Sequence, residues 1–195
     1  HSKYIKKIIV ATSKNKKDDL IKLLVTKNKV LCFRGSEQNV LSRYAECAKL
    51  HNVKDIIRLT ADDPFVDPLI IDKMILKYKK GKFDFISNTP NRTFPLGLDI
   101  TIVKTKILSE ILNLTNKKKH LEHVVNYLFE NKNNYKYFYY DRKKDIYSNM
   151  RWTIDYPSDL KFVRGIYKYL YKENEIFLFK DIINFLISKN YKLKK

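Results

Sequence analysis

The 195-residue sequence predicts an α/β protein in which helices cover both faces of a mixed, mostly parallel sheet. Three observations predict this class. Short apolar runs alternate with amphipathic stretches along the first half of the chain, as expected of repeated strand–helix units. Hydrophobic residues make up 44% of the chain and aromatic residues 13%, which is enough for a sizeable core. No apolar run approaches the roughly 20 residues that span a bilayer, so we expect no membrane partner.

The first half of the chain alternates strand and helix without interruption. Apolar runs predict strands at residues 7–12, 30–33, 55–60 and 83–87. Apolar residues at helical spacing predict helices at residues 16–26, 37–50 and 68–80. Ser36 is a candidate cap for the second of these helices, and Asp67 with Pro68 suits the start of the third. Strands joined by helices favour parallel pairing with right-handed crossovers.

The second half of the chain is less regular. We predict strands at residues 98–103, 135–141 and 150–154, and helices at residues 105–113, 118–131, 158–171 and 179–189. The aromatic segment 135–141 is typical of a sheet edge or an oligomer contact, so a homodimer is one expectation. No internal repeat and no Pro/Gly-rich linker divides the sequence, so we expect a single domain over residues 1–195.

The net charge of +19 and the pI near 9.7 raise the question of a nucleic-acid partner. The excess comes from 33 lysines, against seven arginines, and the lysines are scattered over predicted helix faces and termini. Scattered lysines are typical of solvated surfaces, so we expect no nucleic-acid partner. A basic nucleic-acid-binding module remains the alternative interpretation.

The two cysteines, Cys32 and Cys47, are too few for a disulfide scaffold. Both fall in predicted elements, one in a strand and one in a helix. We therefore expect two reduced thiols in the core of a cytoplasmic protein.

Acidic residues follow two of the predicted strands directly. Asp62 and Asp63 come after the strand at 55–60, and Asp155 comes after the strand at 150–154. Because ligands of α/β proteins bind at the carboxyl ends of strands, we expect Asp62 and Asp155 to converge. Neighbouring carboxylates need a cation or hydrogen bonds to offset their charge, so the pattern predicts a divalent-metal site for a phosphate-bearing substrate. The alternative is that each aspartate only caps the helix that follows it.

Glycine-rich nucleotide loops are missing from this sequence. The chain has four glycines, and no two are close enough for a GxGxxG or Walker motif. If the protein binds a nucleoside triphosphate, this chain uses other groups to hold it.

Seven short motifs occur in a fixed order: ATS, RGSExxVLxRY, RLTxDxPxxDP, SNT, RTxPxGLD, EHV and RWTxDxPxDL. This order resembles the cytidylyltransferase family typified by the spore-coat polysaccharide biosynthesis enzymes. That family is related to the 3-deoxy-manno-octulosonate and acylneuraminate cytidylyltransferases. The resemblance runs from about Ile5 to Leu186.

The resemblance implies a Rossmann-like, GT-A-type nucleotidyltransferase with a three-layer sandwich fold. Such an enzyme joins CMP from CTP to an acidic or modified sugar, uses Mg²⁺ and releases pyrophosphate. By resemblance, the catalytic and metal-binding aspartates are Asp62 and Asp155. The residues that match the nucleotide side are Arg34, Ser36, Arg43 and Asp62. The residues that match the sugar side are Arg92, Gly97, Asp99, Glu122 and His123.

Several of these residues keep an alternative interpretation. Arg34 and Arg43 could form salt bridges with nearby glutamates, Glu37 or Glu46. Arg92 could be a plain loop arginine, and His123 a buried structural histidine.

The sequence also departs from the family pattern. Ala61 stands where the family usually has Gly, Asp63 where it has a small residue or Glu, and Leu96 where it often has Asp. The pattern also begins about 40 residues earlier, with a strand and a loop that wraps the triphosphate. We therefore expect the sheet of this chain to lack that first strand, and activity to depend on the missing loop.

Two other functions remain open at this level. One is a GT-A glycosyltransferase with a nucleotide-sugar donor, which would also use strand-end aspartates and a divalent cation. The other is a non-catalytic relative that oligomerises or binds nucleic acid.

Overall fold

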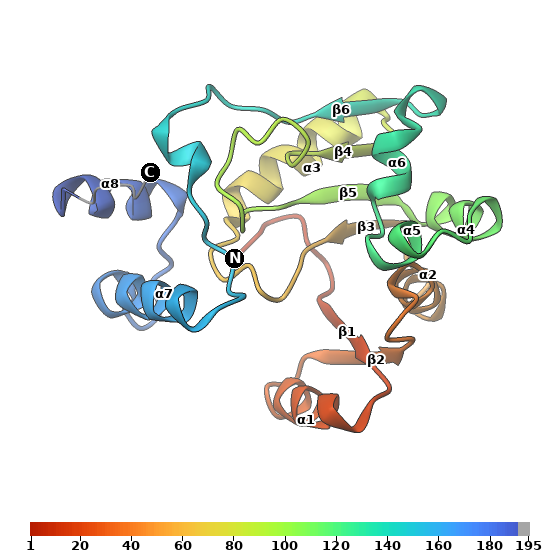
Figure 1. Ribbon diagram of the computed structural model, residues 1–195, viewed down its shortest axis with the longest axis horizontal. Coiled ribbons are helices and arrows are strands. Elements are labelled where there is room, and N and C mark those ends of the chain that lie inside the picture. Colours follow the sequence, from red (N-terminus) through yellow and green to blue (C-terminus); the bar gives the residue numbers. More distant parts are fainter. Residues whose placement is uncertain (191–195) are drawn as a thin grey trace.

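The structure is a computed structural model that describes residues 1–190 of the chain (Figure 1). Its strands are β1 (Ile9–Ser13), β2 (Leu31–Gly35), β3 (Asp55–Arg58), β4 (Phe85–Ser87), β5 (Thr101–Lys104) and β6 (Tyr137–Tyr139). Its α-helices are α1 (Asp19–Lys27), α2 (Val40–Leu50), α3 (Pro68–Gly81), α4 (Thr105–Leu114), α5 (Lys118–Glu122), α6 (Asn126–Glu130), α7 (Pro157–Leu170) and α8 (Phe179–Ser188). Three short 3₁₀ helices lie at Lys16–Asp18, Lys132–Asn134 and Ile146–Asn149.

The strands of the described residues form two sheets. β1 and β2 pair in parallel, and the other strands form a sheet of order β3-β5-β4-β6. In that sheet β5 is antiparallel to both of its neighbours, and β4 and β6 are parallel. The α/β class with a mixed sheet is therefore confirmed, but the four-stranded sheet is not mostly parallel, because β5 runs antiparallel to β3 and β4.

A groove separates the two sheets. Within residues 1–190, β1 pairs only with β2 and β3 pairs only with β5, so each presents one open edge. The space between them has a volume of about 1140 Å³ and is lined by both strands and by α2. Unpaired strand edges expose N–H and C=O groups that can bind another extended segment or a ligand.

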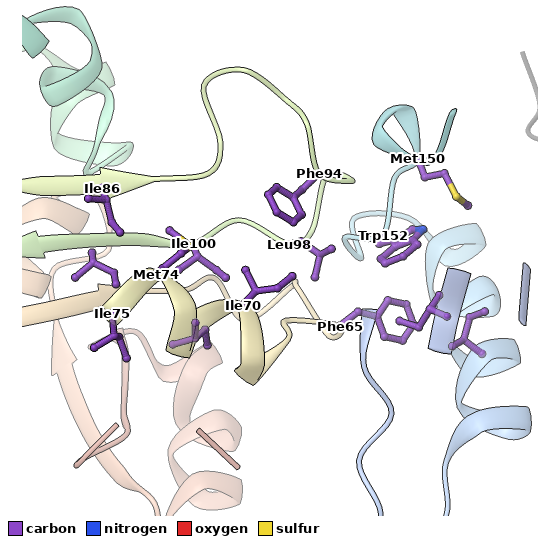
Figure 2. Close-up of a cluster of buried hydrophobic side chains, with 14 of the residues drawn as sticks. Phe65, Ile70, Met74, Ile75, Ile86, Phe94, Leu98, Ile100, Met150 and Trp152 are labelled. Carbon is purple, nitrogen blue, oxygen red and sulfur yellow. The ribbon is translucent and has the colours of Figure 1, made fainter. Parts of the chain in front are cut away.

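The four-stranded sheet carries hydrophobic core on both faces. Side chains alternate between the faces of a strand, so the cross-strand pair Ile86 and Ile102 points one way, and Phe85 and Val103 the other. The first pair packs into a cluster with α3, α7 and α8, part of which Figure 2 shows. The second pair packs against α2, α4 and α6. Helices thus cover both faces, as predicted.

The structure confirms one of the two helix caps discussed above and corrects the other. The Asp67 carboxylate accepts hydrogen bonds from the N–H groups of Leu69 (2.7 Å) and Ile70 (3.3 Å), which confirms Asp67 as the cap of α3. The prediction that Ser36 caps the next helix is wrong. Asn39 caps α2 by accepting from Ser42 N–H at 2.8 Å, because the helix begins at residue 40 and not at 37.

Two predicted elements need correction. Residues 150–154 form no strand, because Met150 and Trp152 bond to one loop residue, Leu96, and make only an isolated bridge there. The helix predicted at 118–131 is broken into α5 and α6 by residues 123–125. Val124 and Val125, which lie in the break, are both buried.

The sequence shows no pattern around His120 and therefore indicates a surface residue, which is wrong. Its side chain is buried, with ring nitrogens hydrogen-bonded to Thr115 Oγ1 (2.8 Å) and Glu130 Oε2 (2.8 Å). The carboxylate of Glu130 is held by Lys119 and His120, and its pKa falls to about 2. The prediction failed because partners 5 and 10 residues away in sequence give no periodic signal.

Trp152 is fully buried. Cys32 and Cys47 are free thiols, but only Cys47 is buried. The cytoplasmic location inferred from them stays a prediction, as does the homodimer. β6 does lie at the edge of the four-stranded sheet formed by the described residues. Among residues 1–190, no helix combines the length and the hydropathy that a bilayer crossing requires.

Candidate active site

Two chain segments about 90 residues apart meet beyond the end of β3. The N–H of Ile154 donates to the carbonyl of Asp62 at 2.9 Å, and Thr153 Oγ1 donates to Asp62 Oδ2 at 3.1 Å. The second bond orients the Asp62 side chain. Asp155 directly follows Ile154, so the two predicted metal-binding aspartates lie on adjacent segments of backbone.

The loop at residues 92–99 holds the second segment in place. Leu96 accepts a hydrogen bond from Trp152 N–H at 2.6 Å and donates to the Met150 carbonyl at 3.0 Å. Gly97 has φ +103°, and a Cβ there would lie 2.5 Å from the backbone nitrogen of Thr153. Only glycine allows this close approach. Trp152 anchors the segment in the core between Leu98 and Phe65 (Figure 2).

The surroundings of Asp63 disfavour the charged form of its carboxyl group. Burial and the negative charges of Asp62 and Asp99 raise the pKa of Asp63 to about 6, although Thr60 Oγ1 donates to it at 2.7 Å. Three acidic residues from two loops therefore share one region. Of these, Asp99 is paired with Arg92, whose Nη1 lies 2.8 Å from Oδ1.

Asp155 is exposed and forms an ion pair with Arg151. The Asp159 carboxylate accepts the backbone N–H groups of Asp155 (2.9 Å) and Tyr156 (3.0 Å). Pro157 takes the first position of α7, and Tyr156 is the cap residue. The Asp155 side chain is therefore not the helix cap, and its one partner among the described residues is the exposed Arg151.

The two aspartates fit the requirements of Mg²⁺. In proteins Mg²⁺ is commonly held by one or two carboxylates, with water and substrate phosphates completing the octahedron. Asp62 Oδ1 has no hydrogen-bond partner among residues 1–190, and the Asp155 carboxylate is on the surface. The same residues contain no group of three or more His, Cys, Asp or Glu that could hold a metal. A site here would thus depend on the substrate for part of its coordination.

Arg34 has a structural role that its sequence position does not reveal. Its guanidinium donates to the carbonyls of Ser13 and Asn15 and pairs with Asp19 at 2.8 Å. The predicted alternative, a salt bridge with a nearby glutamate, is wrong for Arg34. Glu37 pairs instead with Lys17.

Two other arginines line the groove, Arg43 on α2 and Arg58 at the end of β3. Arg43 donates from Nη1 to the Ser36 carbonyl at 2.9 Å and makes no salt bridge with Glu37 or Glu46. Arg58, the last residue of β3, also lines the groove, together with Tyr44 and Asp62. The resemblance gave Arg58 no role in the site, although this residue begins the RLTxDxPxxDP motif and its guanidinium suits phosphate or carboxylate. Its place four residues before Asp62, at the end of a predicted strand, was the available signal.

Glu122 and His123 lie away from the other sugar-side candidates. They end α5, which contacts α2 next to the start of β3 (Figure 1). The loop at 92–99 belongs to the core cluster on the opposite face of the sheet. Both side chains are exposed, so the predicted alternative of a buried His123 is wrong. The chain brings Arg92, Gly97 and Asp99 together with Asp62, but not Glu122 and His123.

Acidic residues beyond the end of a strand, in a helix-covered mixed sheet, define the class of α/β proteins that bind ligands at strand ends. A model of the family described as cytidylyltransferase matches residues 1–182. The chain therefore belongs to the cytidylyltransferase family, a family of nucleotidyltransferases, and the resemblance drawn from its motifs is confirmed.

Two curated relatives share much of this sequence. The uncharacterized protein MJ1063 of Methanocaldococcus jannaschii is 32% identical over 194 residues, which are 99% of this chain and 77% of that protein. The spore coat polysaccharide biosynthesis protein SpsF of Bacillus subtilis is 28% identical over 165 residues, covering 83% of this chain and 67% of the relative.

Two solved structures have a similar fold. A cytidylyltransferase from Leptospira borgpetersenii has a TM-score of 0.89 and 31% identity, covering 97% of this chain and 79% of that one. CMP:2-keto-3-deoxy-manno-octonic acid synthetase, solved in complex with CTP, has a TM-score of 0.59 and 10% identity, covering 86% and 83%. At that identity the second likeness shows the fold alone.

Proposed function

We propose that this protein transfers CMP from CTP to the hydroxyl of an acidic or modified sugar and releases pyrophosphate. The activated sugar would serve the biosynthesis of a surface or spore-coat polysaccharide. Membership of the cytidylyltransferase family supports the nucleotide, and the name of the relative SpsF supports the polysaccharide. One nucleotidyltransferase domain would carry this activity.

The observation that carries the proposal is the junction between Asp62 and residues 153–155. Hydrogen bonds to both the backbone and the side chain of Asp62 bring it next to the segment that ends in Asp155. Nucleotidyl transfer consists mainly of positioning and charge neutralisation, which two fixed carboxylates with a divalent cation can provide.

In the proposed reaction, the sugar oxygen attacks the α-phosphorus of CTP and pyrophosphate leaves. Asp62 and Asp155 would hold Mg²⁺, which when bound neutralises negative charge on the phosphate oxygens. Thr153 would keep the Asp62 carboxylate in one orientation through its 3.1 Å hydrogen bond. Asp159 would keep the backbone of Asp155 in place in the same way.

The sugar would bind beside the loop at 92–99. Arg92 is exposed and pairs with Asp99, whose charge acts on Asp63, so its guanidinium could exchange Asp99 for the carboxylate of an acidic sugar. Gly97 would keep the loop close to Thr153. Glu122 and His123 carry no part of this proposal.

The test is pyrophosphate release from CTP and Mg²⁺ with candidate acidic sugars. Asp62→Asn and Asp155→Asn should each lower kcat by about a hundredfold or more, because each removes a charge that holds the metal. Glu173→Gln is the matched control, since it removes one exposed carboxylate that has no contact with this region. Full rates in both aspartate variants would rule out the metal assignment. Release of a nucleoside diphosphate in place of pyrophosphate would indicate a glycosyltransferase.

A further inference from the structure

Arg92, the arginine proposed to bind the carboxylate of the sugar, has an unusual backbone conformation. Its φ is +46°, in the left-handed region that residues with a Cβ rarely adopt. Such a conformation persists only where the surrounding contacts determine it. One contact is the hydrogen bond from Arg92 N–H to the Thr89 carbonyl, at 3.2 Å. The others are made by the residues on either side of Arg92.

Asp141, which lies 50 residues after Asn91 in the sequence, binds both neighbours of Arg92. Its Oδ2 accepts a hydrogen bond from Asn91 Nδ2 at 2.6 Å, and its Oδ1 accepts one from Thr93 Oγ1 at 3.3 Å. One carboxylate therefore joins the two side chains that flank Arg92. Asp141 forms no ion pair within residues 1–190, so no cation competes for its oxygens there.

The residues that follow Asp141 hold the same loop from its buried side. Ser148 Oγ donates to the Thr93 carbonyl at 2.7 Å, and Arg142 Nη1 donates to it at 3.2 Å. Ser148 and Thr93 are both buried. The segment 141–148 is thus attached to the Arg92 loop by several hydrogen bonds, of which Asp141 makes those nearest the surface.

The guanidinium of Arg92 keeps N–H groups free for an outside partner. Its Nη1 donates to both oxygens of Asp99, at 2.8 and 2.9 Å, and within residues 1–190 its other nitrogens make no side-chain hydrogen bond. Arg142, in contrast, uses both Nη atoms for Asp145 and the loop. A planar guanidinium with free donors suits a carboxylate, and it binds more tightly when its position is fixed beforehand.

We propose that Asp141 is a positioning residue, which fixes the loop so that the Arg92 guanidinium is preorganised for the carboxylate of the sugar. The inference rests on the proposed function and extends it to a residue outside the seven motifs. Asp141 touches no substrate in this proposal and acts through Asn91 and Thr93. A loop that is ordered before binding loses less conformational entropy when the sugar arrives.

The first test is the rate at which trypsin cleaves the Arg92–Thr93 bond, measured by mass spectrometry. A protease needs a loop that can leave its folded conformation. Asp141→Ala should therefore raise this rate by about threefold to tenfold, because hydrogen bonds to a charged group are lost. Cleavage after Arg164, within α7, should not change. Glu173→Ala, which removes an exposed carboxylate elsewhere, should change neither rate.

The second test is a double-mutant cycle in the pyrophosphate-release assay, with the acidic sugar that gives the highest rate. Asp141→Ala should raise KM for this sugar by about threefold to tenfold and leave KM for CTP unchanged. Arg92→Met should raise KM for the sugar further. Adding Asp141→Ala to Arg92→Met should then have no effect, because Asp141 acts only through Arg92. A merely structural residue would cause the same loss in both backgrounds.

Two results would overturn the proposal. One is unchanged cleavage after Arg92 in Asp141→Ala, and the other is an equal rise in KM with and without the Arg92 guanidinium. Asp141→Asn keeps the shape and one acceptor oxygen, so it should have a smaller effect and serves if Asp141→Ala does not fold. The proposed function fails separately. If the parent protein releases no pyrophosphate with any acidic sugar, that function is wrong, whereas faster cleavage after Arg92 would still support Asp141 as the residue that fixes the loop.

Discussion

The unit β1–α1–β2 and the four-stranded sheet are built differently. Both faces of the sheet carry clusters of fully buried side chains. In contrast, α1 has no buried residue, and its apolar side chains Leu20, Leu23 and Leu24 are more than 60% exposed. Hydrophobic burial therefore stabilises the sheet, whereas hydrogen bonds around Asp18 and Arg34 fix the small unit.

This difference separates the two halves of the candidate site. The aspartates and the loop at 92–99 are anchored to a packed core through Trp152 and Leu98. Arg34 and Ser36 belong to a unit whose two-stranded sheet is marginal by itself. We infer that the half with Asp62 and Asp155 is preorganised by this packing.

The two regions should differ most in how much free energy of unfolding is lost when an apolar side chain is truncated. Trp152→Ala should lower the free energy of unfolding by about 3–5 kcal/mol, because the indole is fully buried at the junction of several elements. Urea denaturation measures the change. Trp152→Phe is the control for lost volume. Since the indole Nε1 is buried without a partner among residues 1–190, Trp152→Phe should cost much less.

A second difference should appear between two glycines. Gly97→Ala should cost about 2–3 kcal/mol and lower the rate of pyrophosphate release, because a Cβ at φ +103° collides with the backbone of residues 152–153. Gly165→Ala in α7 has no atom within 4 Å of the new Cβ and should stabilise by about 0.5–1 kcal/mol. Equal effects of the two substitutions on unfolding would contradict the close approach of the loop and residues 152–153.

The pH dependence of stability should have opposite signs in the two regions. Burial raises the folded-state pKa of Asp63 from 3.8 to about 6, so the folded state holds a proton that the unfolded state releases. Stability should then fall as pH rises from about 4 to 6, by about 1 kcal/mol once solvent screening of this partly exposed group is included. Asp63→Asn should remove that slope.

For Asp18 the sign is reversed. Hydrogen bonds, led by that of the Ser13 hydroxyl, lower its pKa below 3.8. Its contribution to stability is present above pH 3.8 and is lost as the pH falls through the lowered value. The difference in unfolding free energy between the parent protein and Asp18→Asn should therefore shrink only in strong acid. A difference that shrinks between pH 4 and 6 would mean that the two carboxyls are misassigned.

The smallest effect is expected on α1. Leu24→Ala should change the free energy of unfolding by no more than about 0.5 kcal/mol, because its side chain is 62% exposed. A loss above about 2 kcal/mol would show that the apolar face of α1 is covered in solution. That result would remove the contrast between the two regions.

The sequence predicted most features whose signal is local. The cap at Asp67, the apolar spacing of α3, α4, α7 and α8, and the presence of a strand before Asp62 are confirmed, although that strand is only half-buried. The segments that carry Asp62 and Asp155 are hydrogen-bonded to each other, whereas a shared metal site stays a prediction. The motif order alone identified the family, because it depends on residue identity and spacing and not on contacts.

The features that the sequence did not predict depend on contacts between residues that are far apart in the chain. Residues 150–154 read as a strand, yet they bond to Leu96 and Asp62, which no periodicity reveals. Arg34 and Arg58 look equivalent in sequence, as arginines at strand ends. The fold surrounds the first with acceptors and leaves the second without any among residues 1–190. Local propensity determines which elements form. The partner of a buried charge depends on which side chains the packed chain brings within about 3 Å, and only the tertiary structure determines that.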